Sequence, residues 1–116
     1  MQTLIILNDP PYGTERSYNG LRLANALLKR DDAPGVTVFL MADAVACAKR
    51  GQTTPDGFYN IERLLKPVAR KGKVLLCGLC MDARGLTLDE TVESAERSSM
   101  DDLAAATVEA DSVLIF

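Results

Sequence analysis

The sequence predicts a single α/β domain spanning residues 1–116, in which helices cover both faces of a parallel sheet. Two observations lead to this prediction. Strand-like apolar runs alternate with helix-like segments along the chain, which is the pattern of parallel sheets with crossover helices. The first apolar run, residues 3–7, is continuous rather than alternating, and this is typical of an interior strand buried on both faces. A chain of 116 residues is also long enough to bury a substantial core.

The first half of the chain is expected to contain two strands and two helices. The strands are residues 3–7 and 36–40, and the helices are residues 15–29 and 44–50. The second strand is rich in β-branched and aromatic residues, a composition typical of strands. Thr14 and Asp43 are the predicted N-caps, because short polar side chains there can accept a hydrogen bond from the first helical turn. Gly51 is expected to follow the second helix at the C′ position.

The second half of the chain is expected to contain three helices and three strands. A helix follows Asn60 and ends at Gly72, strands occupy residues 73–76, 95–97 and 112–116, and helices occupy residues 78–83 and 100–110. Asn60 is the predicted N-cap of the first of these helices, and Ser98 or Ser99 is that of the last. Pro67 is expected to kink or shorten its helix, because proline lacks the N–H that a helix interior uses.

The charge pattern argues against two classes of partner. The net charge is −3 and both signs are scattered along the chain, whereas nucleic acids and anionic membranes attract basic clusters. No apolar run approaches the roughly 20 residues that span a bilayer. The first residues lack the basic segment and cleavage site of a signal peptide. We therefore expect a cytoplasmic protein that binds neither a membrane nor, directly, nucleic acid.

The absence of histidine limits the chemistry that the chain is expected to perform. It removes catalysis by Cys–His and Ser–His pairs, and with it most zinc chemistry. The three cysteines are odd in number and lack the spacing of a disulfide framework, so reduced thiols are expected. We predict neither a bound metal nor a tightly bound cofactor.

The segment 75–86 is the strongest candidate for a reactive site. An apolar strand ends at Cys77, where a short helix begins. In a parallel sheet, ligands and reactive groups gather at this edge, and the loops 8–13 and 41–43 are expected there too. The partial positive charge and free N–H groups of a helix N-terminus favour a thiolate. Arg84 lies two helical turns further on and can fold back towards the sulfur if the helix is short.

The residues alone leave alternatives open. Cys77 is either a reactive thiol or a buried cysteine at a strand end without a chemical role. Cys80 is either a resolving partner, at the CxxC spacing of dithiol proteins, or a small apolar residue on the inner side of the helix. Cys47 lies among alanines and a valine and is expected to belong to the core. Asn8, Asp9 and Tyr12 either line the site or form a turn, and the turn is favoured.

A series of short motifs runs along nearly the whole chain. They are Pro-Tyr-Gly at 11–13, Leu-Arg-Leu-Ala at 21–24, Phe-Leu-Met-Ala-Asp-Ala-Val at 39–45, Arg-Gly-Gln at 50–52, Tyr-Asn-Ile at 59–61, Leu-Cys-x-x-Cys-x-Asp-x-Arg-Gly at 76–85 and Ala-Asp-x-Val-Leu-x-Phe at 110–116. In their order and spacing, the chain resembles the DsrE/DsrF-like family, and most closely its YchN-like branch.

This resemblance implies a three-layer α/β/α fold with a five-stranded, mostly parallel sheet. It also implies homo-oligomers, often hexamers built from two stacked trimers. Sulfur-relay members of the family carry a persulfide on a cysteine seven residues before an Arg-Gly pair. In this sequence that cysteine is Cys77, with Arg84 and Gly85 matching. Cys80 matches the YchN-like branch but not the members dedicated to tRNA thiolation.

Together these observations predict a cytoplasmic sulfur-transfer protein, as a sulfurtransferase or a sulfur-relay subunit. Cys77 is expected to accept sulfane sulfur as a persulfide, with Cys80 and Arg84 as supporting residues. The expected partners are a sulfur donor, a sulfur acceptor and further copies of the chain in a trimer or hexamer. Two alternatives stay open: a non-catalytic oligomeric binding module, and a dithiol–disulfide redox protein that uses Cys77 and Cys80.

Overall fold

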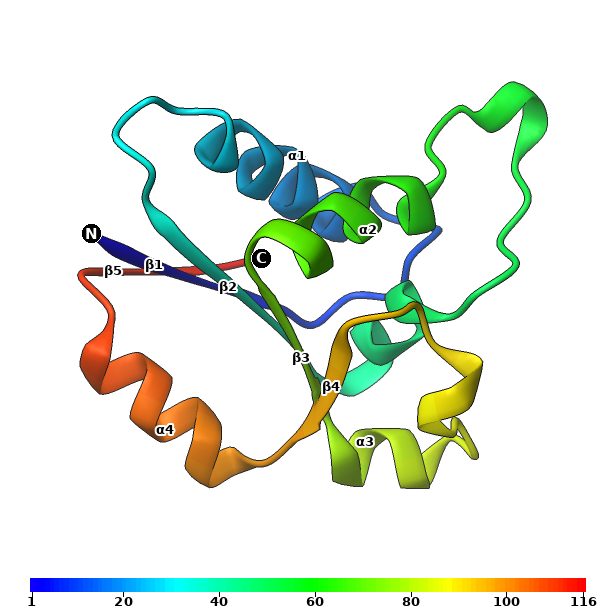
Figure 1. The fold of residues 1–116 in the computed structure, drawn as a ribbon. Coiled ribbons are helices and arrows are strands. Elements are labelled where there is room, and N and C mark those ends of the chain that lie inside the picture. Colours follow the sequence, from blue (N-terminus) through cyan, green and yellow to red (C-terminus); the bar gives the residue numbers. More distant parts are fainter.

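The computed structural model describes all of residues 1–116 and contains one five-stranded sheet, in the order β4-β3-β2-β1-β5 (Figure 1). The strands are β1 (Gln2–Leu7), β2 (Gly35–Leu40), β3 (Lys73–Cys77), β4 (Ala95–Ser98) and β5 (Ser112–Ile115). Every neighbouring pair of strands is parallel. The predicted α/β fold is therefore confirmed, and the sheet is parallel throughout.

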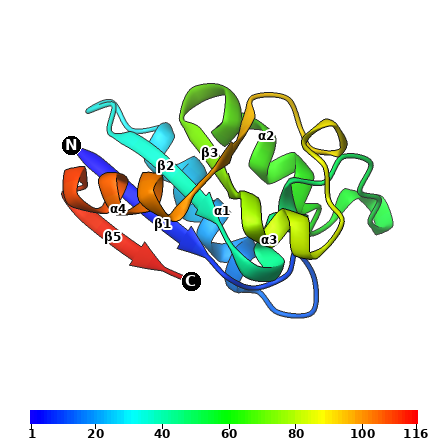
Figure 2. The ribbon, with the colours of Figure 1, turned by 90° about the horizontal axis from the view of Figure 1, so that it is seen from below.

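Helices lie on both faces of the sheet and complete a three-layer arrangement. They are α1 (Arg16–Leu28), α2 (Ile61–Lys71), α3 (Gly78–Ala83) and α4 (Met100–Glu109), with short 3-10 helices η1 (Ala42–Ala48), η2 (Pro55–Gly57) and η3 (Leu88–Glu90) in the connections. α1 and α2 lie side by side over one face, and α4 lies over the other (Figure 1). From the side of α4, α3 is seen to continue directly from the end of β3 (Figure 2). None of the helices combines the length and the apolar character that crossing a membrane requires.

Strands β1 and β2 are covered on both faces along most of their length. Their side chains with at most 1% exposure are Leu4, Ile5, Leu7, Val38, Phe39 and Leu40. Consecutive residues of a strand point to opposite faces, so burial of neighbours such as Leu4 and Ile5 requires cover on both sides. This confirms the interior strand that the continuous apolar run predicts.

Two of the predicted helix caps are wrong. The hydroxyl of Thr14 does not cap α1 and instead donates a hydrogen bond to the carboxylate of Asp9, at 2.9 Å. Asp43 does not cap the following helix, because η1 begins one residue earlier and contains it. The carboxylate of Asp43 instead accepts a hydrogen bond from Arg84, at 2.9 Å. In both places, the side chain that the local sequence predicts as the N-cap forms a hydrogen bond with a residue outside the helix instead.

Other predicted helix boundaries are confirmed. Asn60 and Ser99 each accept a hydrogen bond from a backbone N–H in the first turn of α2 and α4, at 3.1 and 3.2 Å. α2 runs to Lys71 and Gly72 is its C-cap residue, as predicted, but the helix continues through Pro67, so the expectation that this proline shortens it is wrong. These boundaries depend on contacts within a few residues, which local sequence encodes.

Gln52 anchors the loop that connects η1 to α2 and rises at the upper right of Figure 1. Its side-chain amide donates hydrogen bonds to the carbonyls of Cys47 and Lys49, at 3.0 and 2.8 Å, and accepts one from the hydroxyl of Tyr12, at 2.5 Å. Its backbone N–H donates to the carboxylate of Glu62, at 2.8 Å. Gln52 therefore ties this loop to the β1–α1 connection and to α2.

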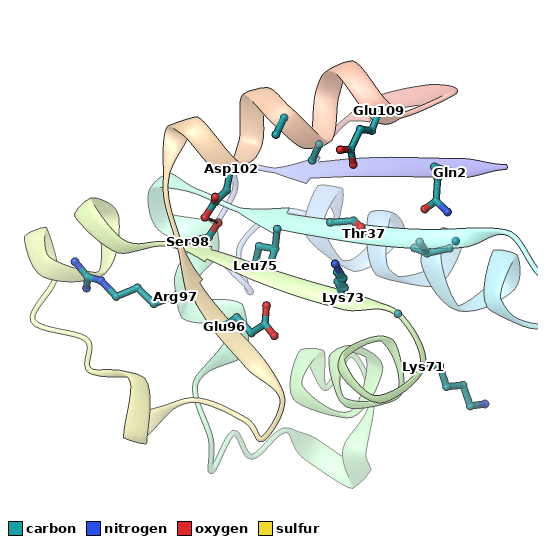
Figure 3. A pocket seen from close by; sticks show the side chains of 15 residues that line it. Gln2, Thr37, Lys71, Lys73, Leu75, Glu96, Arg97, Ser98, Asp102 and Glu109 are labelled. Atoms are coloured by element: carbon teal, nitrogen blue, oxygen red, sulfur yellow. Dashed lines mark hydrogen bonds between the residues drawn. The ribbon is translucent and has the colours of Figure 1, made fainter.

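The α4 side of the sheet is only partly covered. A hollow of about 740 Å³ lies beside α4 (Figure 3). Its walls include Thr37, Lys73, Leu75 and Glu96 from the strands and Asp102 and Glu109 from α4. Ser98, which pairs with Cys77 across β4 and β3, lines the hollow, but Cys77 does not. The hollow and the cysteine segment are therefore neighbouring but separate features.

Candidate functional site

Cys77 lies where β3 ends and α3 begins, as the sequence predicts. It is the N-cap residue of α3, and its sulfur accepts a hydrogen bond from the backbone N–H of Cys80, at 3.4 Å. The fully buried Val74 and Leu76 hold β3 in the core, so the sheet fixes the position of the thiol. Cys77 is 8% exposed. The result is a sheltered thiol at the carboxyl edge of the sheet.

Gly85 closes the short helix that follows Cys77. Its φ of 64° lies in the left-handed region, where a side chain would cause strain. The N–H groups of Gly85 and Leu86 donate to the carbonyls of Asp82 and Met81, at 3.2 and 3.0 Å, which is a Schellman motif. The glycine of the Arg-Gly pair therefore has a structural role in ending α3.

Burial raises the pKa of the Cys77 thiol above its ordinary value. The hydrogen bond with the Cys80 side chain acts in the same direction, whereas the backbone N–H groups of Cys80 and Leu79 oppose it. The N–H groups at the helix start favour the thiolate, as expected, but burial outweighs them. α3 is only six residues long, and removal of the sulfur from water outweighs its N–H groups.

Arg84 forms no hydrogen bond with the Cys77 sulfur. Its Nε donates to the carboxylate of Asp43 at 2.9 Å, and its Nη1 donates to the carbonyl of Cys80 at 3.0 Å. These two bonds tie the end of α3 to η1. Arg84 therefore has a structural role at this site, because it connects α3 to η1.

Arg97 is a cation that lies against the start of α3, beside Cys77, and sequence reasoning missed it. Its guanidinium forms two parallel hydrogen bonds with the Asp82 carboxylate, both at 2.8 Å. The hydrogen bond and charge of Asp82 raise the pKa of Arg97, and a Cys77 thiolate raises it further. A Cβ atom on Gly78 would lie 2.7 Å from the guanidinium carbon, so this glycine lets the cation lie against the start of α3.

A weak signal for Arg97 does exist in the sequence. The residue falls at the end of a predicted strand, and parallel strands bring their carboxyl ends to one edge. The sequence pattern does not predict that the strand carrying Arg97 lies beside the strand that ends at Cys77. The register of β4 against β3, which sets Arg97 opposite Leu76 and Ser98 opposite Cys77, supplies that information.

Cys80 stands beside Cys77 on α3 and is partly exposed. Its sulfur accepts a hydrogen bond from the N–H of Ala42, at 3.2 Å. Ala42 has a φ of 51°, in the left-handed region that alanine rarely adopts. All three cysteines are free thiols. The Cys80 thiol therefore links α3 to η1 and also lies where it can meet a group carried by Cys77.

The remaining sequence candidates serve the fold. The carbonyl of Asp9 accepts hydrogen bonds from the hydroxyl of Ser17 at 2.7 Å and from the thiol of Cys47 at 3.9 Å. The hydroxyl of Tyr12 donates a hydrogen bond to the side chain of Gln52. Cys47 is completely buried, and burial raises the pKa of its thiol to about 12. These contacts agree with a turn and a core cysteine, the interpretations that the sequence favours.

The functional groups at this site are suited to the chemistry of thiols. Two cysteines lie three residues apart at the start of α3, a guanidinium lies against the glycine between them, and the chain contains no imidazole to act as a base. No group of three or more cysteine, aspartate or glutamate side chains is arranged to hold a metal ion. Neighbouring thiols of this kind can transfer a sulfur atom or exchange disulfides.

The whole chain matches the model of one protein family. The DsrE/DsrF-like family model matches residues 1–116. The chain belongs to the DsrE/DsrF-like family. Protein YchN of Escherichia coli (strain K12) is 39% identical over 118 residues, covering 100% of both chains. The uncharacterized protein MJ0989 of Methanocaldococcus jannaschii is 38% identical over 118 residues, also covering 100% of both chains.

Solved structures of similar proteins agree with this family assignment. The crystal structure of YchN from E. coli matches with a TM-score of 0.91 at 37% identity, covering 100% of both chains. The structure of MTH1491, a protein of unknown function from Methanobacterium thermoautotrophicum, matches with a TM-score of 0.73 at 13% identity, covering 99% of this chain and 97% of that one. The second likeness shows the fold alone. Membership of the DsrE/DsrF-like family, which the sequence motifs predict, supports a sulfur-relay-related role in general.

Proposed function

We propose that this chain is a cytoplasmic persulfide carrier in which Cys77 accepts sulfane sulfur from a donor protein and passes it to an acceptor. The Cys77 thiol loses its proton to solvent, and the thiolate attacks the outer sulfur of a donor persulfide. The sulfur–sulfur bond of the donor breaks as the new bond to Cys77 forms, and the donor leaves as a thiolate. Delivery to an acceptor thiol repeats this exchange, so no external oxidant or reductant is needed.

The position of the Cys77 sulfur is the observation that carries this proposal. The sulfur lies at the carboxyl edge of the sheet and accepts the N–H of Cys80 at 3.4 Å, and the residue as a whole is 8% exposed. Low exposure protects a bound persulfide from unselective thiols, and the Arg97 guanidinium lies against the neighbouring Gly78. Because burial raises the pKa of Cys77, sulfur acceptance is expected to become faster as the pH rises towards that pKa.

Incubation with glutathione persulfide, followed by intact-mass measurement, tests this function. We expect wild type to gain one sulfur atom and Cys77→Ser to gain none, because the accepting nucleophile is gone. Cys47→Ser is the matched control and is expected to load like wild type, since Cys47 is fully buried. An equal gain by wild type and Cys77→Ser would show that the accepting atom lies elsewhere.

A dithiol–disulfide function is the second candidate, and the hydrogen bond between the Cys80 N–H and the Cys77 sulfur favours it. The same loading experiment separates the two. In wild type, a persulfide carrier keeps its added sulfur, whereas a dithiol protein releases it as hydrosulfide when Cys80 attacks the Cys77 sulfur and closes a disulfide. Cys80→Ser cannot close this disulfide and gives the retention time of an undisturbed persulfide. We expect wild type to retain the added sulfur as long as Cys80→Ser, and rapid loss from wild type alone would favour the dithiol function.

We also propose that the chain acts as a homo-oligomer, a trimer or a hexamer. The outer edge of β5 is unpaired, and its Val113, Leu114 and Ile115 are 38%, 38% and 70% exposed. Unpaired strand edges with apolar side chains favour association between chains. Sedimentation equilibrium is expected to show a trimer or hexamer for wild type and smaller species for Ile115→Lys. Asp31→Lys, in an exposed turn, is the control. A monomeric wild type at micromolar concentration would contradict this proposal.

A further inference from the structure

All three tyrosines of the chain line one hollow. This hollow, of about 410 Å³, lies between the β1–α1 connection, the start of α1 and the end of the loop before α2. Its walls include Tyr12, Tyr18, Tyr59, Glu15, Pro11 and Gly13. Neither Cys77 nor Cys80 contributes to it, so the hollow is separate from the proposed sulfur site.

Contacts within the fold hold the three rings in place. The hydroxyl of Tyr12 donates to the side chain of Gln52 at 2.5 Å and accepts the N–H of Ile61 at 3.3 Å. The rings of Tyr18 and Tyr59 lie with their centroids 4.6 Å apart and their planes at 41°. Tyr12 and Tyr59 are still 40% and 54% exposed, so the rings are fixed but remain open to a ligand.

The backbone at Tyr59 is strained. Its φ of 58° lies in the left-handed region, which bulky residues rarely adopt. The next residue, Asn60, caps α2 and donates a hydrogen bond to the carbonyl of Gln52, so both sides of the loop are held. Strain of this kind persists where the surroundings impose it, and such positions cluster at binding sites. Here it places the Tyr59 ring against Tyr18.

The charge of the hollow has one sign. Glu15 is the only charged residue of its lining, and it takes part in no ion pair. Outside the lining, the guanidinium of Arg22 lies 5.7 Å from the centroid of the Tyr18 ring. This ring therefore already accepts a cation at the distance of a cation–π contact. Aromatic faces with one free carboxylate suit a positively charged ligand.

We propose that the hollow formed by Tyr12, Tyr18, Tyr59 and Glu15 binds a compact organic cation with an alkylated nitrogen, such as a trimethylammonium group. The aromatic faces would contact the methyl groups, over which the positive charge is spread, and Glu15 would balance that charge. An anion would be repelled by Glu15, and a neutral ligand of the same shape would lose both electrostatic contributions.

Tyrosine fluorescence gives a readout of this hollow alone, because the chain contains no tryptophan and no other tyrosine. Choline chloride is titrated into the full-length protein, with sodium chloride as the control for ionic strength. We expect a saturable change in emission with choline. The neutral isostere 3,3-dimethylbutan-1-ol is expected to bind about tenfold more weakly or not at all. No saturable response to choline, or equal binding of the neutral isostere, would overturn the proposal.

Three variants identify the groups involved. Tyr59→Gly removes one ring while suiting the left-handed backbone, so it is expected to fold normally and to weaken choline binding about tenfold. Glu15→Gln is expected to weaken binding by about threefold to tenfold, whereas Tyr18→Phe keeps the aromatic face and stays within about twofold of wild type. Cys77→Ser is the control with unchanged binding. Wild-type affinity in Tyr59→Gly would rule out the site.

Discussion

Gly72→Ala is expected to destabilise this protein by about 3 kcal/mol, a large part of the stability of a domain of this size. A Cβ atom at Gly72 would lie 2.4 Å from the carbonyl oxygen of Val36 and 3.3 Å from that of Val68. Both obstacles are backbone atoms, so no side chain can rotate away. The end of α2 and the start of β2 would have to move apart, although β2 lies in the middle of the sheet. Urea unfolding followed by circular dichroism measures the loss.

Gly51→Ala is the matched control for this prediction. Gly51 has a φ of 85°, but a Cβ atom there would meet nothing within 4 Å. Its replacement therefore introduces backbone strain without a clash and is expected to cost about 1 kcal/mol. If Gly72→Ala costs no more than Gly51→Ala, the close approach of α2 and β2 is looser than the structure shows.

Arg97→Gln is expected to slow alkylation of Cys77 by iodoacetamide about fivefold at pH 7.5. A positive charge near a thiolate stabilises it and lowers the pKa of the thiol. Without the Arg97 guanidinium, the effect of burial is less opposed, and the pKa of the Cys77 thiol is expected to rise. The apparent pKa in the pH profile of alkylation should therefore move upward. Peptide-resolved mass spectrometry assigns the modified cysteine. A profile unchanged from wild type would show that Arg97 only supports the packing of α3.

Two further variants separate charge from structure in this prediction. Arg84→Gln removes a guanidinium that is held by Asp43 and the Cys80 carbonyl, so Cys77 should react within about twofold of wild type. Asp82→Asn keeps the size of the side chain that binds Arg97 but removes its negative charge. It is expected to speed alkylation, because the guanidinium then acts on the thiolate without an opposing carboxylate. A slower reaction in Asp82→Asn would mean that orientation of Arg97 outweighs its charge.

The position of Cys77 could be predicted from the sequence because it depends on neighbouring residues. An apolar run that stops at Cys77 and is followed by a short helix can be recognised within about ten residues. The caps at Asn60 and Ser99 are equally local. Thr14 and Asp43 carry the same cap chemistry, but residues outside their helices take their side chains. Local patterns do not contain the identity of such partners.

The amino-acid sequence was enough to predict the family, the succession of strands and helices along the chain, and the placement of Cys77 at a strand–helix junction. These follow from periodicity and motif spacing along the chain. The surroundings of that cysteine depend on the tertiary structure: burial raises its pKa, Arg84 is bound to Asp43 and the Cys80 carbonyl, and Arg97 lies against Gly78. Desolvation and Coulomb interactions depend on distances between segments that are far apart in the sequence. In this protein, the pairing of β4 with β3 and the packing of the core fix those distances.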